Sequence, residues 1–312
     1  MADIITLTIN PAIDTSTAVG RVTPDHKLRC GPTRRDPGGG GINVARVARR
    51  FGADVVALYP TGGVLGQLLR RLTDREDIRS LSIPIAEETR EDFTVSETET
   101  GQQYRFVLPG PRLSEAEWRA CLDAFVSFEG QPHFVVASGS LPPGVPEDFY
   151  GRIAKAANEA GTKMVVDSSG AALKAVVKAG VYLLKPSLRE LRELADRALS
   201  GERDWVAACR KLVTDGCAEV VALTLGDKGA LLVTRDQALY APAIPIKPVS
   251  TVGAGDSFLG AMIWSLCSGH GLQNAFRYGV AAGSAALLTP GTDLCRREDV
   301  ERLLGDVNIR TI

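Results

Sequence analysis

The second half of the chain alternates short, almost continuous apolar runs with longer segments whose apolar residues fall at helical spacing. The runs cover residues 134–138, 164–167, 181–184 and 220–225. Continuous apolar strands connected by helices are typical of a parallel sheet that is covered by helices on both faces. We therefore expect an α/β fold, a three-layer sandwich around a mostly parallel central sheet.

The first hundred residues combine this rhythm with a second pattern. Strands of the central sheet are predicted over 4–9 and 55–59, and helices over 44–51 and 65–72. Residues 15–35 are polar with scattered β-branched positions that suggest short strands, and residues 89–108 alternate as a hairpin does. These two segments predict a small β-sheet lid on a single domain that spans residues 1–312.

Polar residues and glycines gather where the predicted strands end, and that edge of an α/β sheet binds ligands. Asp14 lies in the loop just after the first strand, although an acid there is equally compatible with a simple turn. Glycines 38–41 precede a helix that has Asn43 at its start, where the amide can cap the helix or donate to a sugar hydroxyl. A flexible linker is the alternative, but linkers do not usually run straight into an amphipathic helix.

Residues 250–257 carry the clearest chemical signal. Gly253, Ala254 and Gly255 are followed at once by Asp256, and the apolar run 258–264 predicts a buried helix. The free N–H groups of a helix N-terminus form an anion site, so the acid can lie beside a reacting phosphoryl group. A tight turn with Asp256 as helix cap is the alternative. We expect this position to lower the pKa of Asp256 and make it a weak base.

Composition excludes several classes of function. The chain has 312 residues, with 36 Lys plus Arg against 37 Asp plus Glu, and a net charge of -1 gives no case for nucleic-acid or membrane binding. The N-terminus has no signal-peptide pattern. The six cysteines form no Cys-x-x-Cys pair and the three histidines lie far apart, which argues against a zinc site. We expect a cytoplasmic enzyme.

Together these residues resemble the ribokinase-like, PfkB-type carbohydrate kinase family. Two motifs carry the resemblance, Gly-Gly-Gly-Gly-Ile-Asn-Val-Ala at 38–45 and Thr-Val-Gly-Ala-Gly-Asp-Ser at 251–257, in the family order. The chain lacks the Gly-x-x-x-x-Gly-Lys loop of P-loop kinases. Stretches 103–107, 138–144 and 167–170 look most like the minor, ribokinase-type 6-phosphofructokinases. Related 1-phosphofructokinases and tagatose-6-phosphate kinases usually carry lysine where this chain has Gly40.

The resemblance implies a role for each motif residue. Asp256 is the general base, with an anion hole formed by the N–H groups of Gly253, Ala254 and Gly255. The sugar is held by Asp14, Gly39, Gly40 and Asn43, and its phosphate by Lys27, Arg90, Arg105 and Ser140. The nucleotide is lined by Lys185, Ser187, Thr224, Gly226, Gly229 and Ser284. Glu190 supports Mg²⁺ through water, and loops at Ser250, Val252, Ala286 and Gly291 hold K⁺. Taken alone, Arg90 and Arg105 are more readily explained as arginines on solvated strand faces.

The implied activity is ATP-dependent phosphorylation of fructose 6-phosphate to fructose 1,6-bisphosphate, by a homodimer joined through its lids. One alternative is a fructose 1-phosphate or tagatose 6-phosphate kinase of the same family. The other, a non-catalytic sugar or nucleotide sensor, is disfavoured because the chain keeps Asp256 and both glycines. Two departures stand out. Ser187 replaces the asparagine of the family's Asn-x-x-Glu motif, and Thr23 replaces a tyrosine of close relatives, so inhibition by a second ATP does not follow from the resemblance.

Overall fold

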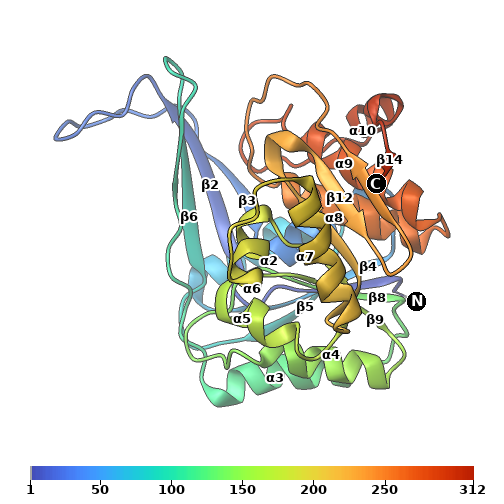
Figure 1. Cartoon of the computed structure of the whole chain (residues 1–312). Helices are drawn as coiled ribbons and strands as arrows, with labels where there is room; N and C mark the ends of the chain where they lie inside the picture. Colours follow the sequence, from blue (N-terminus) through green and yellow to red (C-terminus); the bar gives the residue numbers. More distant parts are fainter. Residues whose placement is uncertain (1) are drawn as a thin grey trace.

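A ten-stranded sheet crosses the computed structural model, which describes residues 2–312 (Figure 1). The strand order is β14-β13-β12-β11-β10-β9-β8-β1-β4-β5. The strands are β1 (Ile4–Leu7), β4 (Val55–Thr61), β5 (Arg79–Pro84), β8 (Phe134–Ser138), β9 (Lys163–Asp167), β10 (Val181–Leu184), β11 (Ala218–Thr224), β12 (Ala230–Val233), β13 (Ala238–Ala241) and β14 (Arg310–Thr311). Neighbours from β11 to β5 are parallel, and β12, β13 and β14 add an antiparallel edge.

Helices cover both faces of this sheet, as predicted. One hydrophobic cluster lies under α1 (Gly40–Arg50), α2 (Gly63–Arg75), α8 (Ala254–Cys267), α9 (Leu272–Ala286) and α10 (Arg297–Leu303). The other lies under α3 (Glu115–Val126), α4 (Phe149–Glu159), α5 (Gly170–Val176), α6 (Leu188–Ala195) and α7 (Glu202–Thr214). Successive strand side chains point to opposite faces, so Ile4 joins the first cluster and Ile5 the second. The predicted three-layer α/β sandwich is confirmed. Within residues 2–312, every helix is too short or too polar to cross a bilayer.

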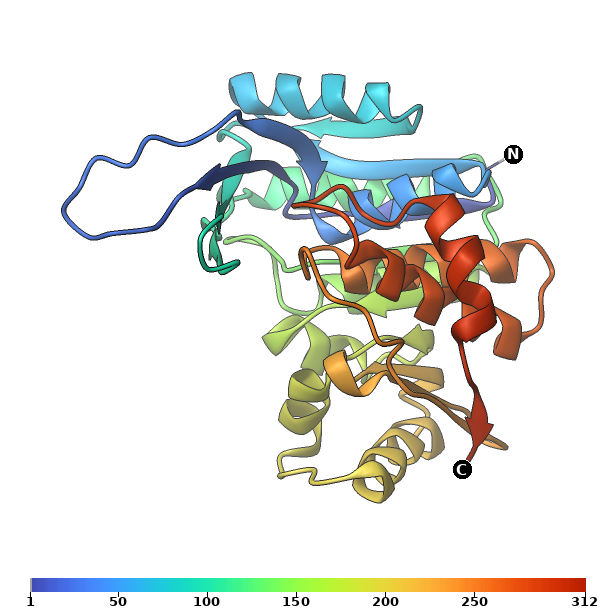
Figure 2. The same cartoon turned by 90° about the horizontal axis from the view of Figure 1, so that it is seen from above.

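A second sheet rises from one end of the molecule as the predicted lid (Figures 1 and 2). Its strand order is β3 (Arg34–Gly38), β2 (Ala12–Val19), β6 (Arg90–Glu97) and β7 (Gln103–Phe106). β2 pairs in parallel with β6, and the two outer pairs are antiparallel.

Two details of the predicted lid were wrong. Asp14 lies inside β2 and not in a loop, because the chain enters the lid sheet directly after Pro11. Residues 20–33 form no strand, and Figure 2 shows them as a long loop that projects away from the body. Gly20, Pro24, Gly31 and Pro32 explain the second difference, since both residue types favour turns and proline has no N–H to donate to a neighbouring strand.

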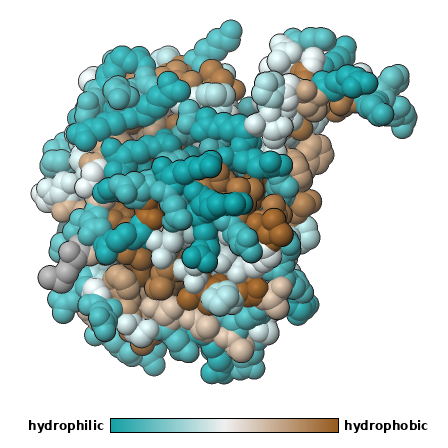
Figure 3. Space-filling view, turned by 180° about the vertical axis from the view of Figure 1, so that it is seen from behind, coloured by the Kyte–Doolittle hydropathy of each residue, from teal (hydrophilic) through white to brown (hydrophobic). Residues whose placement is uncertain are grey.

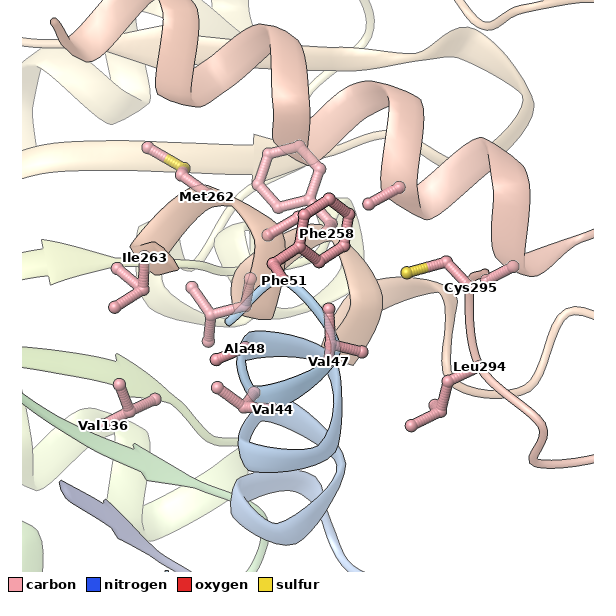
Figure 4. Close-up of a cluster of buried hydrophobic side chains, with 14 of the residues drawn as sticks. Val44, Val47, Ala48, Phe51, Val136, Phe258, Met262, Ile263, Leu294 and Cys295 are labelled. Atoms are coloured by element: carbon pink, nitrogen blue, oxygen red, sulfur yellow. The ribbon is translucent and has the colours of Figure 1, made fainter. Parts of the chain in front are cut away.

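The close packing of α1 on α8 brings the two sequence motifs together. A Cβ on Gly260 would lie 2.7 Å from Val47 Cβ and 3.0 Å from the Val44 carbonyl oxygen, so only glycine permits this approach. Figure 4 shows the apolar side chains of α1 and α8 that fill the contact, among them Val44, Val47 and Phe258. The polar ends of both helices consequently meet at the carboxyl ends of the parallel strands.

Candidate active site

The predicted site residues other than Lys27 gather at the carboxyl edge of the parallel strands, beneath the lid. This is the edge at which open α/β sheets bind ligands. A cavity of about 830 Å³ opens at the opposite edge, where Gly161, Gly180 and Gly216 belong to its lining. None of the predicted site residues line this cavity. The geometry therefore favours the lid side as the site of chemistry.

Asp256 stands in the first turn of α8, as the sequence predicts. Gly253 caps the helix with a left-handed backbone (φ 74°), and a Cβ there would meet Leu294 Cδ2 at 2.4 Å. The N–H groups of this first turn have no acceptor within the helix and remain available to an anion. Asn43 Nδ2 donates to Asp256 Oδ2 over 2.9 Å, which joins the two motifs across 213 positions of sequence.

The expected pKa of Asp256 was wrong in direction. Burial raises the pKa of this carboxyl above its ordinary value, and it outweighs the lowering effects of the Asn43 hydrogen bond and of the charges on Lys185, Arg105 and Arg46. Asp256 keeps some surface open towards the site, but dense protein surrounds it. A raised pKa makes Asp256 a stronger proton acceptor than a helix N-terminus alone would give.

Lys185 was expected to line the nucleotide site, but it lies beside the N-terminal turn of α8 that carries Asp256. Its Nζ is 3.0 Å from Asp167 Oδ2, and a Cβ on Gly255 would lie 3.4 Å from Nζ. The charges of Asp167, Asp256 and Glu190 raise the pKa of Lys185 against the effect of its burial. Lys185 is therefore a fixed cation beside the N-terminal turn of α8. It does not line the nucleotide cavity described below.

Asp167 is a site residue that sequence reasoning did not assign. It ends β9, next to the end of β10, and burial raises its pKa to about 6 despite the opposing charge of Lys185. Asp256 and Glu190 push in the same direction as burial. An acid that directly ends a predicted strand was the available signal, because the ends of adjacent parallel strands meet at the ligand-binding edge.

The base of the lid gathers acids and arginines around Asp14. Register places Asp14 between Asp36 of β3 and Asp92 of β6. Burial, followed by the charge of Asp92, raises the pKa of Asp14 to about 7, although the charges of Arg105, Arg46 and Arg90 act against this shift. Asp92 was also missed by sequence reasoning.

Arg90 is held in place while one of its donors remains free. It forms an ion pair with Asp92 at 3.0 Å and donates to the Asn10 carbonyl over 3.1 Å. Its buried Nε has no partner among residues 2–312. Arg105 is exposed, and its charge reaches both Asp14 and Asp256.

The four other predicted sugar-side residues differ in placement. Gly39 has φ 102° and packs on Thr8, while a Cβ on Gly40 would lie 2.2 Å from Ser138 Oγ, so both positions exclude a side chain in this geometry. Ser140 is exposed and accepts from Asn10 Nδ2 over 3.1 Å. Lys27 is not brought to the site within this chain, since it is exposed in the projecting loop. A lysine in a sequence signals charge, but it does not indicate how far its loop extends.

A cavity of about 850 Å³ adjoins the first turn of α8 and collects most of the predicted nucleotide residues. It is lined by Ser187, Thr224, Gly226, Gly229 and Ser284, together with Ala254 and Gly255. Sequence reasoning missed its apolar wall, which includes Ile244, Pro245, Ile246, Val280 and Leu287. Apolar walls with a few polar groups are typical of sites for planar organic ligands, so the cavity suits a purine base.

Ser187 and Glu190 form a capping box at the start of α6. Ser187 Oγ accepts from the Glu190 N–H over 3.3 Å, and the Ser187 N–H donates to Glu190 Oε2 over 2.8 Å. Glu190 also lies 3.3 Å from Arg189. The carboxylate is thus fixed near Lys185, with its remaining acceptor capacity available to a water molecule on a divalent cation.

Three of the predicted potassium residues, Ser250, Val252 and Gly291, lie on two neighbouring loops, and Ala286 is the last residue of α9. Ser250 Oγ is within hydrogen-bonding distance of the Gly291 carbonyl (3.4 Å), and the Val252 N–H donates to Ser250 Oγ over 3.2 Å. The Leu287 carbonyl, next to Ala286, accepts from the Val249 N–H over 2.7 Å. Hydroxyl and carbonyl oxygens without a carboxylate suit a monovalent cation better than a divalent one.

Comparison with known proteins agrees with this geometry. The family model for the pfkB family of carbohydrate kinases matches residues 3–299. An ATP-dependent 6-phosphofructokinase isozyme 2 from Mycobacterium tuberculosis is 49% identical over 96% of this chain and 88% of the relative. The Escherichia coli protein of the same name is 39% identical over 97% of this chain and 98% of its own length.

The solved structures lead to the same family. Phosphofructokinase-2 from E. coli, in complex with substrates and products, superposes with a TM-score of 0.94 at 38% identity and covers 98% of this chain and 99% of the other. The same E. coli protein has been solved with potassium and in a tetrameric inhibited form. The extent of these matches shows that the chain belongs to the pfkB family of carbohydrate kinases.

Proposed function

We propose that the chain is a 6-phosphofructokinase, which transfers the terminal phosphoryl group of ATP to fructose 6-phosphate. The observation that carries this proposal is the placement of Asp256, bonded to Asn43, between two different compartments. On one side lie Arg90 and Arg105 at the base of the lid, and on the other lies the nucleotide cavity. The similarity to relatives of that name supports the choice of acceptor.

Each group in this arrangement has a chemical task. Asp256 accepts the proton of the attacking hydroxyl, and the first-turn N–H groups of α8 together with Lys185 stabilise negative charge on the transferred group. Asp14 and Asn43 hold the sugar hydroxyls. Arg90 and Arg105 bind the sugar phosphate, for which the unpartnered Arg90 Nε is an available donor. Gly39 and Gly40 keep the sugar side open, and Ser140 adds a hydroxyl at its rim.

Metals and nucleotide complete the proposed reaction. Ser187, Thr224, Gly226, Gly229 and Ser284 would surround ATP. Glu190 would hold a water molecule of Mg²⁺, and the cation would supply charge neutralisation at the phosphates. The oxygen-rich loops at Ser250, Val252, Ala286 and Gly291 would hold K⁺ next to the turn that starts α8. The potassium-bound structure of the E. coli protein supports this assignment.

We also propose that two chains form a homodimer through their lids. The lid exposes Phe93 and Phe106, which pair across β6 and β7 and are 37% and 53% exposed. Seen from behind, the projecting lobe carries hydrophobic as well as hydrophilic surface (Figure 3). Exposed apolar surface on a sheet with free edges favours association. A clasp between lids would also give Lys27 a route to a sugar phosphate. Residues 1–312 would act as one catalytic unit in the cytoplasm.

A coupled kinase assay tests the proposed acceptor. Fructose 6-phosphate, fructose 1-phosphate, tagatose 6-phosphate, ribose and adenosine are compared with the wild-type chain, and fructose 6-phosphate should give the highest kcat/KM. A preference for another acceptor would refute that part of the proposal. Asp256→Asn is the matched variant, and it should lower kcat by about two to four orders of magnitude while substrates still bind. More than about a tenth of the wild-type kcat would show that Asp256 is not the base.

A further inference from the structure

Arg46 is an arginine of α1 whose side chain is completely shielded from solvent. Burying a guanidinium group is costly unless acceptors surround it. Arg46 Nε donates to Glu76 Oε1 over 2.9 Å, and Nη2 lies 2.8 Å from the same oxygen. Nη1 reaches the carbonyl oxygens of Pro37 and Thr292, each over 3.2 Å. Nη2 is held by its ion pair with Glu76 and has no hydrogen bond of good geometry among residues 2–312.

One hydrogen bond of Arg46 leads through Asn43 to Asp256, the proposed general base. Arg46 Nη1 shares its two N–H groups among three acceptors, the two carbonyls and Asn43 Oδ1 at 3.3 Å, while Asn43 Nδ2 donates to Asp256 Oδ2 over 2.9 Å. A side-chain amide has one acceptor end and one donor end. Because Arg46 can only donate and an ionised Asp256 can only accept, the two partners together fix which end of the amide faces the base.

The same arginine connects this pair to segments that border the site. It lies 3.6 Å from Asp36 in lid strand β3, and Asp36 accepts from Thr292 Oγ1 over 2.8 Å. Thr292 follows Gly291 in one of the two loops assigned to the monovalent cation. Arg46 therefore contacts the lid, the loop after α9 and the amide that holds the base, which is more than helix packing requires.

We propose that Arg46 is a positioning residue for phosphoryl transfer, which orients Asn43 towards Asp256. The charge of Arg46 also favours the ionised form of Asp256, after those of Lys185 and Arg105. The proposal rests on the proposed role of Asp256 as base. The charged groups that face Asp256 from other elements are Lys185 after β10, Arg105 on β7 and Asp167 on β9. Lys185 and Arg105 stay in place when Arg46 is changed, so the loss of Arg46 should shift the ionisation of Asp256 without abolishing it.

Two variants separate geometry from charge. Arg46→Met removes both the positive charge and the hydrogen bonds of the guanidinium group. It should lower kcat by about 10- to 100-fold, because misplaced catalytic groups cause losses of this size. It should also move the acidic limb of the kcat/KM profile to higher pH. Arg46→Lys keeps a cation but not the planar fork, so kcat should fall by about tenfold while the acidic limb stays in place. KM for Mg-ATP should change by less than about twofold in both, because Arg46 does not touch the nucleotide cavity.

Arg277→Met is the matched control. Arg277 is also a helical arginine that donates to backbone carbonyls, those of Leu304 and Val307, but none of these residues belongs to the site. Its loss should lower stability and leave kcat and the pH profile at wild-type values. All rates are divided by the folded fraction measured by circular dichroism at the assay temperature.

The outcomes distinguish this inference from the proposed function. The acceptor with the highest kcat/KM for the wild type is used throughout, so another preferred sugar changes the acceptor but not the comparison. If Asp256→Asn is inactive while folded Arg46→Lys and Arg46→Met match the wild type in kcat and acidic limb, Arg46 is only structural and the inference fails. If Arg46→Met does not fold, Arg46→Lys alone decides, and a kcat within about twofold of the wild type overturns the inference.

Discussion

Ionisation of the Asp14 carboxyl should lower the free energy of unfolding of the ligand-free protein. Both the direction and the magnitude of this effect can be predicted. The carboxyl lies between strands that carry Asp36 and Asp92 at the same level. It is packed so closely on Gly38 that a Cβ there would be 2.4 Å from Asp14 Cγ. Burial first and Asp92 second raise the pKa of Asp14 from 3.8 to about 7.

The size of the effect follows from this shift. An acid whose pKa is higher in the folded than in the unfolded chain loses no stability below the unfolded pKa, and becomes increasingly unfavourable as pH rises towards the folded pKa. From 3.8 to about 7 is about 3 pH units, which corresponds to about 4 kcal/mol above pH 7 as an upper limit. Asparagine at this position has the same shape and cannot ionise. Asp14→Asn should therefore gain stability relative to the wild type as pH rises.

Urea unfolding at pH 5 and pH 8 measures this effect. The free energy of unfolding of Asp14→Asn, minus that of the wild type, should be up to about 2.6 kcal/mol larger at pH 8 than at pH 5, because part of the penalty is already present at pH 5. Asp236→Asn, at an exposed turn between β12 and β13, controls for the general effect of removing a carboxylate. If the difference in the free energy of unfolding between Asp14→Asn and the wild type does not change with pH, burial does not raise the pKa of Asp14 and the prediction is refuted. In the kinase assay the same variant should raise KM for the sugar phosphate, since Asp14 holds sugar hydroxyls in the proposed function.

Three further predictions concern other parts of the site. Ser187→Asn should tighten apparent Mg-ATP binding by at most about 1.5–3 kcal/mol. It should not lower stability, because asparagine caps a helix as well as serine does. An unchanged KM for Mg-ATP would show that serine is a neutral replacement. Phe106→Glu should convert the proposed dimer to a monomer in light scattering at micromolar concentration, and a monomeric wild type would contradict the proposed lid contact. Gly40→Ala should lower kcat/KM by about tenfold because its Cβ meets Ser138, whereas Gly201→Ala, with nothing within 4 Å, should not; equal effects would exclude the steric reason.

The sequence predicted those features that depend on short stretches of chain. Apolar runs predicted the parallel strands, and the glycines before two apolar helices predicted α1 and α8 with Asn43 and Asp256 at their starts. Ser114 and Glu117, which are spaced as a capping box requires, form one at the start of α3. These features are encoded within about ten residues, where spacing and turn chemistry decide the outcome.

Features that depend on sheet order could not be predicted in the same way. Asp167 pairs with Lys185 because β9 and β10 are neighbours, and Arg46 contacts Thr292 because α1 packs on α8 through Gly260. The sequence around each of these residues does not indicate which strand or helix the residue will contact in the folded chain. Lys27 shows the converse, since a plausible cation lies in a loop that extends away from the site of its own chain.

Asp256 shows why local reasoning gave the wrong sign for a pKa. A helix N-terminus favours the ionised carboxylate, but the effect of a dipole at a helix end is modest, whereas enclosure by protein removes most of the hydration on which the charge depends. Lys185, Arg105, Arg46 and Asn43 restore only part of that loss. Such a balance suits a base in phosphoryl transfer, which must be ionised before the reaction and basic enough to accept a proton as the new bond forms. The cations that keep Asp256 ionised come from β7, α1 and the end of β10, so its reactivity belongs to the assembled site and not to the motif that contains it.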